Sequence, residues 1–213
     1  KNSEKRKWCK LMKRFLSILI CLSLCFAFVG CGNSDKQNQE AKEILTKVLQ
    51  YEQTFTAKTS VLSDKTTEQT LEKYHFQTVD NAYYSFVPAY YIFVDCDTDN
   101  IDELVILDAR LYCYLVLRYD GKKVYGYNCA GIGDIKKFKA NGTFEPKLKD
   151  GEQKIAFLKF DGYDFEVVEK AYMNKNENKY LIDGKTEDKD TVEKYFDNWF
   201  ENTPNANWIK IEE

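Results

Sequence analysis

The sequence predicts an α+β fold in which an antiparallel β-sheet meander is flanked by an N-terminal and a C-terminal amphipathic helix. Two stretches near the ends of the predicted domain carry apolar residues at helical spacing. Between them, short runs rich in β-branched and aromatic residues alternate with Asp-Gly and Asn-Gly pairs. Such pairs are typical of tight turns, so the runs that they separate are expected to be neighbouring antiparallel strands.

The chain begins with an expected export signal. Residues 15–29 form an apolar run without a charge, preceded by Lys13 and Arg14 and followed by Gly30 and Cys31. A basic region, an apolar region of this length and a small residue before the cleavage site characterise a signal peptide. The run is too short for a transmembrane helix, which needs about 20 residues. The Gly-Cys junction resembles a bacterial lipobox, in which Cys31 is lipidated and becomes the first residue of the mature protein.

We therefore expect residues 1–31 to be a lipoprotein signal peptide, residues 32–40 a flexible tether and residues 41–213 a single α+β domain. Met12 would make a normal signal start, which suggests that residues 1–11 are not translated. An uncleaved N-terminal anchor is the alternative interpretation of the apolar run. In the lipoprotein interpretation the domain is extracytoplasmic, held at the outer face of the cell membrane by acyl chains on Cys31.

The charge balance argues against nucleic acid as a partner. Of the 31 basic and 34 acidic residues, seven basic and one acidic residue lie in residues 1–31. The remainder keeps 24 basic and 33 acidic residues, a formal charge of −9. Nucleic acids and anionic membrane surfaces both require a basic face. Contact with the membrane is thus expected only through lipidated Cys31.

Apolar residues at helical spacing predict one helix after the tether and another near the end of the chain. The first stripe comprises Ala41, Ile44, Leu45, Val48, Leu49 and Phe55, and the second comprises Val192, Tyr195, Phe196, Trp199 and Phe200. Asp188 or Thr186 is expected to cap the second helix, which Pro204 helps to end. Both stripes are expected to face one surface of the sheet.

The residues between the helices are expected to form mainly strands and turns. Residues 66–74 are interpreted as a short helix and residues 82–86 as a strand. Further strands are predicted at 91–94, 104–107, 111–119, 123–127, 154–160, 164–170 and 178–182, with turns at 120–121, 141–142, 161–162 and 183–184.

An acidic loop between two of these strands is the clearest candidate site. Residues 95–103 carry five carboxylates, which repel one another at close range. A hard divalent cation would relieve this repulsion, and Ca²⁺ takes oxygen ligands at alternate positions of such loops. The expected calcium ligands are Asp95, Asp97, Asp99, the main-chain carbonyl of Ile101, and Glu103. A solvated acidic turn that binds no ion is the alternative interpretation.

The loop resembles the D-x-D-x-D-G-x-x-[DE]-L hairpin loops of integrin-type repeats and of many exported Gram-positive proteins, with Asn100 in the place of the Gly. Its flanks are predicted strands, whereas an EF-hand has a helix on each side. Together with the helix after the tether, the hairpin at 118–126 and the turn at 180–185, the loop resembles a group of small Clostridia-type surface lipoproteins without an assigned activity. This resemblance implies an exported lipoprotein that binds calcium, but it implies no reaction.

Histidine and cysteine usage limits the chemistry available to the domain. His75 is the only histidine, which argues against zinc sites built on histidine pairs, and it is expected to be partly buried and structural. Cys96, Cys113 and Cys129 are the only cysteines after Cys31, and we expect them to be free, buried thiols. None of the common nucleophile, metalloprotease or phosphate-loop motifs occurs in the sequence.

The leading functional hypothesis is therefore a calcium-stabilised surface lipoprotein that binds a protein or a glycan, and not an enzyme. Aromatic side chains on a sheet can stack on sugars or anchor an interface, and four tyrosines alternate along two predicted strands. These are Tyr112, Tyr114, Tyr125 and Tyr127, and packing of this face by the terminal helices is the favoured interpretation over exposure. The alternative function is a small cell-wall or carbohydrate hydrolase that uses paired carboxylates.

Overall fold

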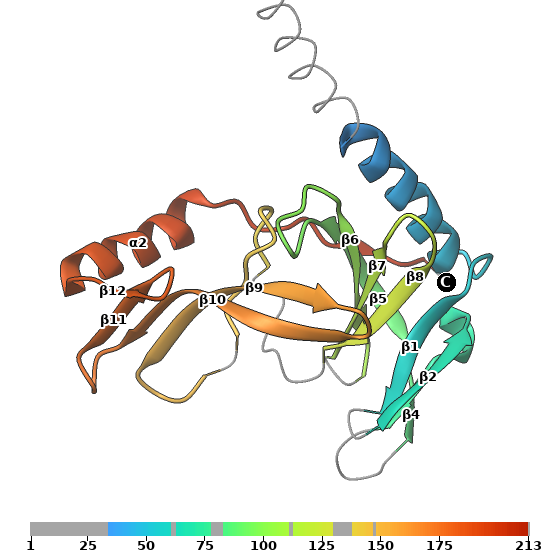
Figure 1. Cartoon of the computed structure of the whole chain (residues 1–213), viewed down its shortest axis with the longest axis horizontal. Coiled ribbons are helices and arrows are strands. Elements are labelled where there is room, and N and C mark those ends of the chain that lie inside the picture. The colour runs from blue at the N-terminus through green and yellow to red at the C-terminus, as the bar shows by residue number, and fades with distance from the viewer. Residues whose placement is uncertain are drawn as a thin grey trace, which may run out of the picture. The chain divides into compact units, whose positions relative to one another are not determined.

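The computed structural model describes residues 34–60, 63–77, 83–110, 113–129, 138–146 and 148–212 (Figure 1). Cys31 and the expected signal peptide lie outside these residues, so anchoring stays a prediction. The chain divides into residues 1–39 and a compact unit of residues 40–213. Within the part of the chain that is described, no helix is long and apolar enough to cross a membrane.

The elements follow one another in an order that is mostly β. A helix covers residues 34–49. The elements after it are β1 (Phe55–Ser60), β2 (Ser63–Gln69), the 3₁₀ turn η1 (Leu71–Lys73), β3 (His75–Gln77), β4 (Tyr83–Ser85), β5 (Pro88–Val94), β6 (Glu103–Asp108), β7 (Tyr114–Tyr119), β8 (Val124–Asn128), β9 (Glu152–Asp161), β10 (Asp164–Asn174), β11 (Lys179–Ile182), β12 (Lys185–Thr186), α2 (Lys189–Asn202) and β13 (Ile209–Lys210). The α+β class predicted from the sequence is confirmed.

A nine-stranded sheet, here called the large sheet, contains the acidic loop. Its strand order is β13-β5-β6-β7-β8-β1-β3-β4, with β2 paired to β1. Strands β5 to β8 form the predicted antiparallel meander. The prediction of a wholly antiparallel sheet is wrong, because β1 runs parallel to both β8 and β3. The outer edge of the meander is therefore filled by a strand that precedes it in the chain.

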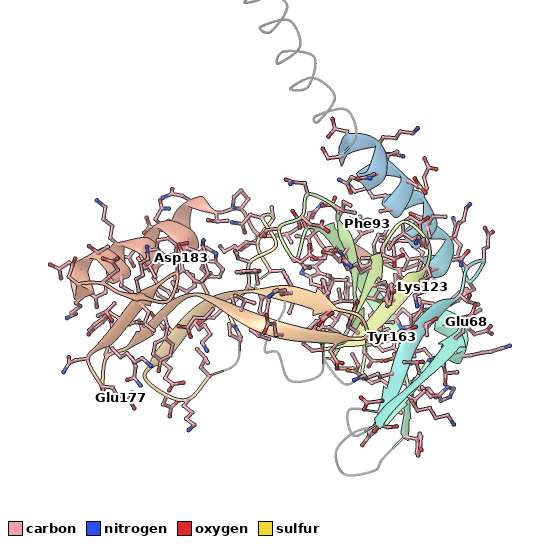
Figure 2. All side chains as sticks on the ribbon, in the orientation of Figure 1. Glu68, Phe93, Lys123, Tyr163, Glu177 and Asp183 are labelled. Atoms are coloured by element: carbon pink, nitrogen blue, oxygen red, sulfur yellow. The ribbon has the colours of Figure 1, made fainter. Side chains whose placement is uncertain are left out.

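Strands β9 to β12 form a second, four-stranded antiparallel sheet, here called the small sheet, in the order β12-β11-β10-β9. The turn between β9 and β10 reaches the large sheet, where the Tyr127 hydroxyl donates to the Gly162 carbonyl at 2.8 Å. Beside it, Lys123 Nζ donates to the Tyr163 hydroxyl at 2.8 Å (Figure 2). A shared core lies between the sheets, with Val105, Val116 and Leu158 fully buried.

The two helical stripes lie on different sheets, so the expectation that they face one surface is wrong. Leu45 and Val48 pack in a core with residues of β6 and β7. Phe196 and Trp199 instead pack against the small sheet, in a separate core that also contains Met173. Figure 1 shows α2 beside β11 and β12. The centre of each stripe is buried as predicted, but Phe200 of the second stripe is 41% exposed. The helical period also does not specify which sheet buries a stripe.

Residues 55–74 differ most from the prediction. Phe55 is buried as expected, but it opens β1 instead of extending the helix. The stretch interpreted as a helix at 66–74 is strand β2 up to Gln69, followed by the single turn η1. Strand β2 is polar and pairs with β1 along its length, so backbone pairing with β1 decides its conformation. The cap of α2 is as predicted, since Asp188 accepts a hydrogen bond from the Thr191 N–H.

A candidate metal centre in the β5–β6 loop

The acidic loop connects two central strands of the large sheet. It leaves β5 after Val94 and enters β6 at Glu103, and these two residues are paired across the strands. Two residues of the loop adopt positive φ, Thr98 at 66° and Asn100 at 69°. Asparagine tolerates this conformation, as the sequence predicted, whereas a β-branched threonine is strained there. The loop is therefore folded more tightly than an ordinary hairpin connection.

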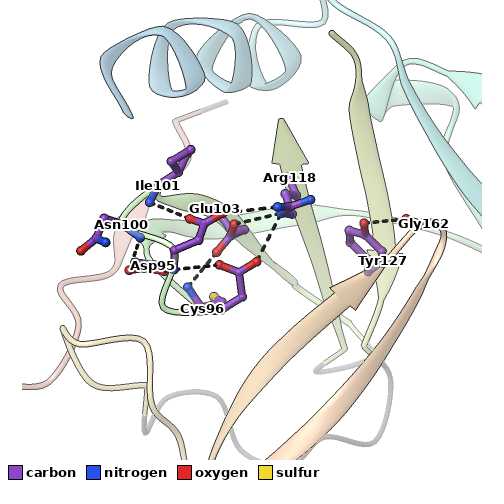
Figure 3. Close-up of polar contacts among 10 residues, drawn as sticks. Asp95, Cys96, Asn100, Ile101, Glu103, Arg118, Tyr127 and Gly162 are labelled. Atoms are coloured by element: carbon purple, nitrogen blue, oxygen red, sulfur yellow. Dashed lines mark hydrogen bonds and ion pairs between the residues drawn. The ribbon is translucent and has the colours of Figure 1, made fainter. Parts of the chain in front are cut away.

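Main-chain N–H groups hold the carboxylates of the loop inward. Asp95 accepts hydrogen bonds from the N–H groups of Asp99 at 3.2 Å and Asn100 at 2.9 Å. Asp97 accepts from the same Asp99 N–H at 3.3 Å. Asp99 in turn accepts from the Ile101 N–H at 2.8 Å. The chain thus wraps around its own acidic side chains (Figure 3).

Three of the predicted ligands converge. One carboxylate oxygen from each of Asp95, Asp97 and Asp99 lies within 4.8 Å of the others. Two oxygens bound to one Ca²⁺ are at most about 5 Å apart, because each Ca–O distance is 2.3–2.6 Å. The three carboxylates therefore have a spacing that one calcium ion could bridge.

Glu103, the predicted terminal ligand, does not belong to this converging group, and it is 1% exposed. Its Oε2 accepts a hydrogen bond from the Cys96 N–H at 2.7 Å. Its Oε1 is buried and has no hydrogen-bond partner among the described residues. Burial, and then the nearby charge of Asp97, raises the pKa of Glu103 well above its usual range. Glu103 thus has one buried carboxylate oxygen without a hydrogen-bond partner among the described residues.

Arg118 is the residue of this site that the sequence reasoning missed. It lies near the end of β7, next to β6, and its Nε is 3.3 Å from Asp97 Oδ2. Its Nη2 is 3.3 Å from Asp99 Oδ2, and its Nε is 3.8 Å from Glu103 Oε1. The signal was present in the Arg118-Tyr119-Asp120-Gly121 hairpin, because an antiparallel meander places the end of β7 beside the start of β6.

The positive charge supplied by the described ion pairs is smaller than the negative charge of the loop. Arg118 pairs with three of the loop carboxylates, and Lys42 pairs with Asp102 at 2.6 Å. Five carboxylates and these two cations leave a formal charge of −3. A divalent cation would reduce this charge to −1. The charge alone does not distinguish Mg²⁺ from Ca²⁺, which differ in the coordination geometry they require.

The pKa values of two loop carboxylates are raised, mainly by burial and secondarily by neighbouring charge. Burial, followed by the neighbouring charge of Asp99, raises the pKa of Asp97 to about 6. Burial also raises the pKa of Asp95. Both carboxylates would be easier to ionise with a bound cation beside them, since an opposite charge at close range favours the ionised form.

The remaining predicted residues lie away from the loop or serve its packing. Cys96, Cys113 and Cys129 are free and buried, as expected, and burial raises the pKa of each thiol. His75 is exposed rather than partly buried, and its Nδ1 lies 2.6 Å from the Lys73 carbonyl oxygen.

Those tyrosines named from the sequence that the structure describes are covered, as favoured, but by the core between the two sheets and not by the terminal helices. Tyr114 and Tyr127 are buried, and Tyr112 lies outside the described residues. Exposed tyrosines instead flank a pocket of about 990 Å³ at the opposite end of β5 and β6 from the acidic loop. They are Tyr51, 48% exposed, and Tyr90, 40% exposed.

Comparison with known proteins gives no further information on this site: no family model, curated protein or solved structure matches the chain.

Proposed function

We propose that the protein is an exported surface lipoprotein whose β5–β6 loop binds Ca²⁺ and whose folded domain binds a protein or a glycan. The observation that carries the calcium part is the convergence of Asp95, Asp97 and Asp99 within 4.8 Å. Glu103 adds a second observation, because its buried Oε1 has no hydrogen-bond partner among the described residues and Arg118 Nε, at 3.8 Å, is too far away to donate to it. The main-chain carbonyl of Ile101 would complete the expected ligand set.

Calcium is expected to have a structural role, because the loop leads from the partly buried strand β5 into β6, whose residues are all buried. Calcium sites of extracellular modules typically have a Kd of about 10⁻⁴–10⁻³ M. A ligand at ten times its Kd stabilises the native state by about 1.4 kcal/mol. For a domain of this size, Tm should therefore rise by about 3–5 °C. Mg²⁺ should raise Tm much less, because it requires a smaller octahedral shell and keeps its waters.

Titration calorimetry and thermal melts at millimolar Ca²⁺ test this proposal. Asp97→Asn should weaken the binding heat and the Tm response. Asp102→Asn is the matched control, because it removes one charge from the same loop but lies outside the converging group and pairs with Lys42. Absence of both heat and a Tm shift in the wild type would reduce the loop to a solvated acidic turn.

Membrane anchoring at Cys31 is proposed from the sequence. Cys31→Ser should release the protein into the medium or leave an unprocessed precursor, which fractionation and mass measurement would detect. Unchanged processing together with unchanged membrane association would refute lipidation at this residue.

For the ligand, the pocket between Tyr51 and Tyr90 is the best-supported surface. It is also lined by Pro88, Asp108 and Lys210. Aromatic faces stack on the apolar faces of sugars and also serve as anchors in protein interfaces. Two exposed tyrosines beside polar groups therefore fit either a glycan or a protein segment.

Two carboxylates line this pocket, Asp108 and Glu212, and the state of Asp108 argues against a hydrolytic pair. Asp108 is buried, and both of its oxygens already accept main-chain hydrogen bonds, from Val87 N–H at 2.6 Å and Arg110 N–H at 2.7 Å. A carboxylate held in this way is a poor general acid or base, since proton transfer requires an oxygen that can reach the substrate.

A glycan array and a pull-down, each run in Ca²⁺ and in EDTA, test the ligand proposal. Tyr51→Ala and Tyr90→Ala should each reduce retention of a ligand. Tyr83→Ala is the control, because Tyr83 is 70% exposed but does not line this pocket. Release of reducing ends from a bound glycan would instead favour the hydrolase.

A further inference from the structure

The backbone at the start of the acidic loop is in direct contact with elements that belong to the small sheet. The Cys96 carbonyl accepts a hydrogen bond from the Leu158 N–H of β9 at 2.9 Å. Gly142, in the turn at residues 139–143, lies so close to the Asp95 carbonyl that a Cβ at Gly142 would overlap with its oxygen. Only glycine allows this approach, so the turn and the loop backbone touch without an intervening side chain.

The turn at 139–143 is also connected to β9 and α2 by hydrogen bonds. Next to it, Phe144 and Ala156 exchange two main-chain hydrogen bonds, both of 2.9 Å. The Trp199 indole N–H donates to the Thr143 hydroxyl at 2.7 Å, and both groups are buried. Contact with the loop therefore extends through the turn to the helix that covers the small sheet.

A side chain links the same two parts of the molecule. Arg118, whose guanidinium pairs with Asp97 and Asp99, lies 5.8 Å from the centroid of the Phe160 ring on β9. A cation over an aromatic face is attracted by its ring electrons, so the position of Arg118 depends on both the loop and β9.

We infer that the acidic loop is a calcium-dependent joint, in which bound Ca²⁺ fixes the Asp95–Cys96 backbone and so holds β9, the 139–143 turn and α2 against the large sheet. This inference rests on the proposed calcium site and adds its consequence for the rest of the fold. Without the ion, repulsion among the loop carboxylates favours a looser backbone, and the two carbonyl contacts of that backbone are weakened with it.

The small sheet has a second attachment that does not involve the loop. At the β9–β10 turn, Lys58 pairs with Asp164 at 2.6 Å, and the Tyr127 hydroxyl donates to Gly162. Loss of calcium should therefore loosen the joint at 139–158 while the β9–β10 turn stays attached.

Hydrogen exchange of the full-length protein, measured in excess Ca²⁺ and in EDTA, tests the joint. Some amides exchange only after a local opening of the structure that releases calcium. When Ca²⁺ is present at ten times its Kd, these amides should exchange about tenfold more slowly than in EDTA. We expect this slowing at Phe144, Ala156 and Leu158. Slowing confined to residues 95–103, in a protein whose calcium heat is intact, would overturn the inference. Absence of calcium heat would overturn the proposed calcium site itself.

Complete unfolding also releases calcium, so calcium could slow exchange throughout the domain without any effect specific to the joint. A pair of glycine variants separates these two effects. Gly142→Ala breaks the contact with Asp95, whereas Gly121→Ala introduces a side chain at a similar φ of +88° with nothing within 4 Å. Gly121→Ala should keep the wild-type calcium heat, whereas Gly142→Ala should still bind calcium but with a higher Kd, because its Cβ displaces the Asp95 carbonyl. Each variant is therefore measured at ten times its own Kd. Gly142→Ala should lose most of the slowing at Ala156 and Leu158, and Gly121→Ala should keep it. Equal slowing in both variants would overturn the inference. If Gly142→Ala does not fold, the β9–β10 turn of the wild type is the reference: slowing at Ala156 and Leu158 that exceeds the slowing at this turn supports the inference, and equal slowing at both overturns it.

Discussion

Acidification should stabilise the calcium-free protein, because of the unusual state of Asp97. Its side chain is 10% exposed, and its pKa is raised from 3.8 to about 6, mainly by burial and then by the charge of Asp99. Between these two pKa values the native state binds more protons than the unfolded chain. The free energy of unfolding therefore rises as the pH falls through this window, and the effect is complete below the unfolded pKa.

The size of the effect follows from the shift. A rise of about two pKa units corresponds to about 3 kcal/mol of destabilisation when Asp97 is fully ionised. Protonation at pH 5.5 recovers about 0.8 kcal/mol of this relative to pH 7.5. For a domain of this size, Tm should rise by about 2–3 °C. Glu103, whose pKa is also raised by burial, should add to the increase.

Thermal melts in EDTA at pH 7.5, 6.5 and 5.5 measure this directly. Asp97→Asn should be at least as stable as the wild type at pH 7.5 and should gain about 0.8 kcal/mol less on acidification. Asp102→Asn should retain the full wild-type gain. In excess Ca²⁺ the calcium response should weaken as the pH falls, because protons compete with the metal for the carboxylates. A wild-type Tm in EDTA that falls between pH 7.5 and 5.5, or a gain that Asp97→Asn leaves intact, would refute the reasoning.

Two further predictions concern the helices. Leu45→Ala and Phe196→Ala should each lower the free energy of unfolding by about 2–5 kcal/mol in urea melts, because both side chains are buried, whereas Phe200→Ala on the exposed side of α2 should cost less than about 1 kcal/mol. A loss below about 0.5 kcal/mol at Leu45 or Phe196 would show that its stripe is not core. Asp188→Ala should lower the free energy of unfolding by about 1 kcal/mol through loss of the α2 cap, and an unchanged urea midpoint would contradict a capping role.

The sequence by itself determined the features that depend on near neighbours in the chain. The meander from β5 to β8 follows from short apolar runs and the Asp120-Gly121 turn. The cap at Asp188 and the buried side of α2 follow from a local hydrogen bond and a helical period. The acidic loop could also be read directly, because alternate aspartates between two strands converge within one turn of chain.

Tertiary structure decided what depends on partners distant in the chain. Strand β2, polar and with little apolar periodicity, is extended because β1 pairs with it. Strand β1 pairs in parallel with β8, and the two helices pack on different sheets. Local sequence patterns do not distinguish these partners from other possible ones. Arg118 lies on β7, the strand next to β6 in the predicted meander, so its place beside the loop was accessible from the sequence. Gly142 reaches the acidic loop from a turn outside the meander, so this backbone contact comes only from the assembled fold.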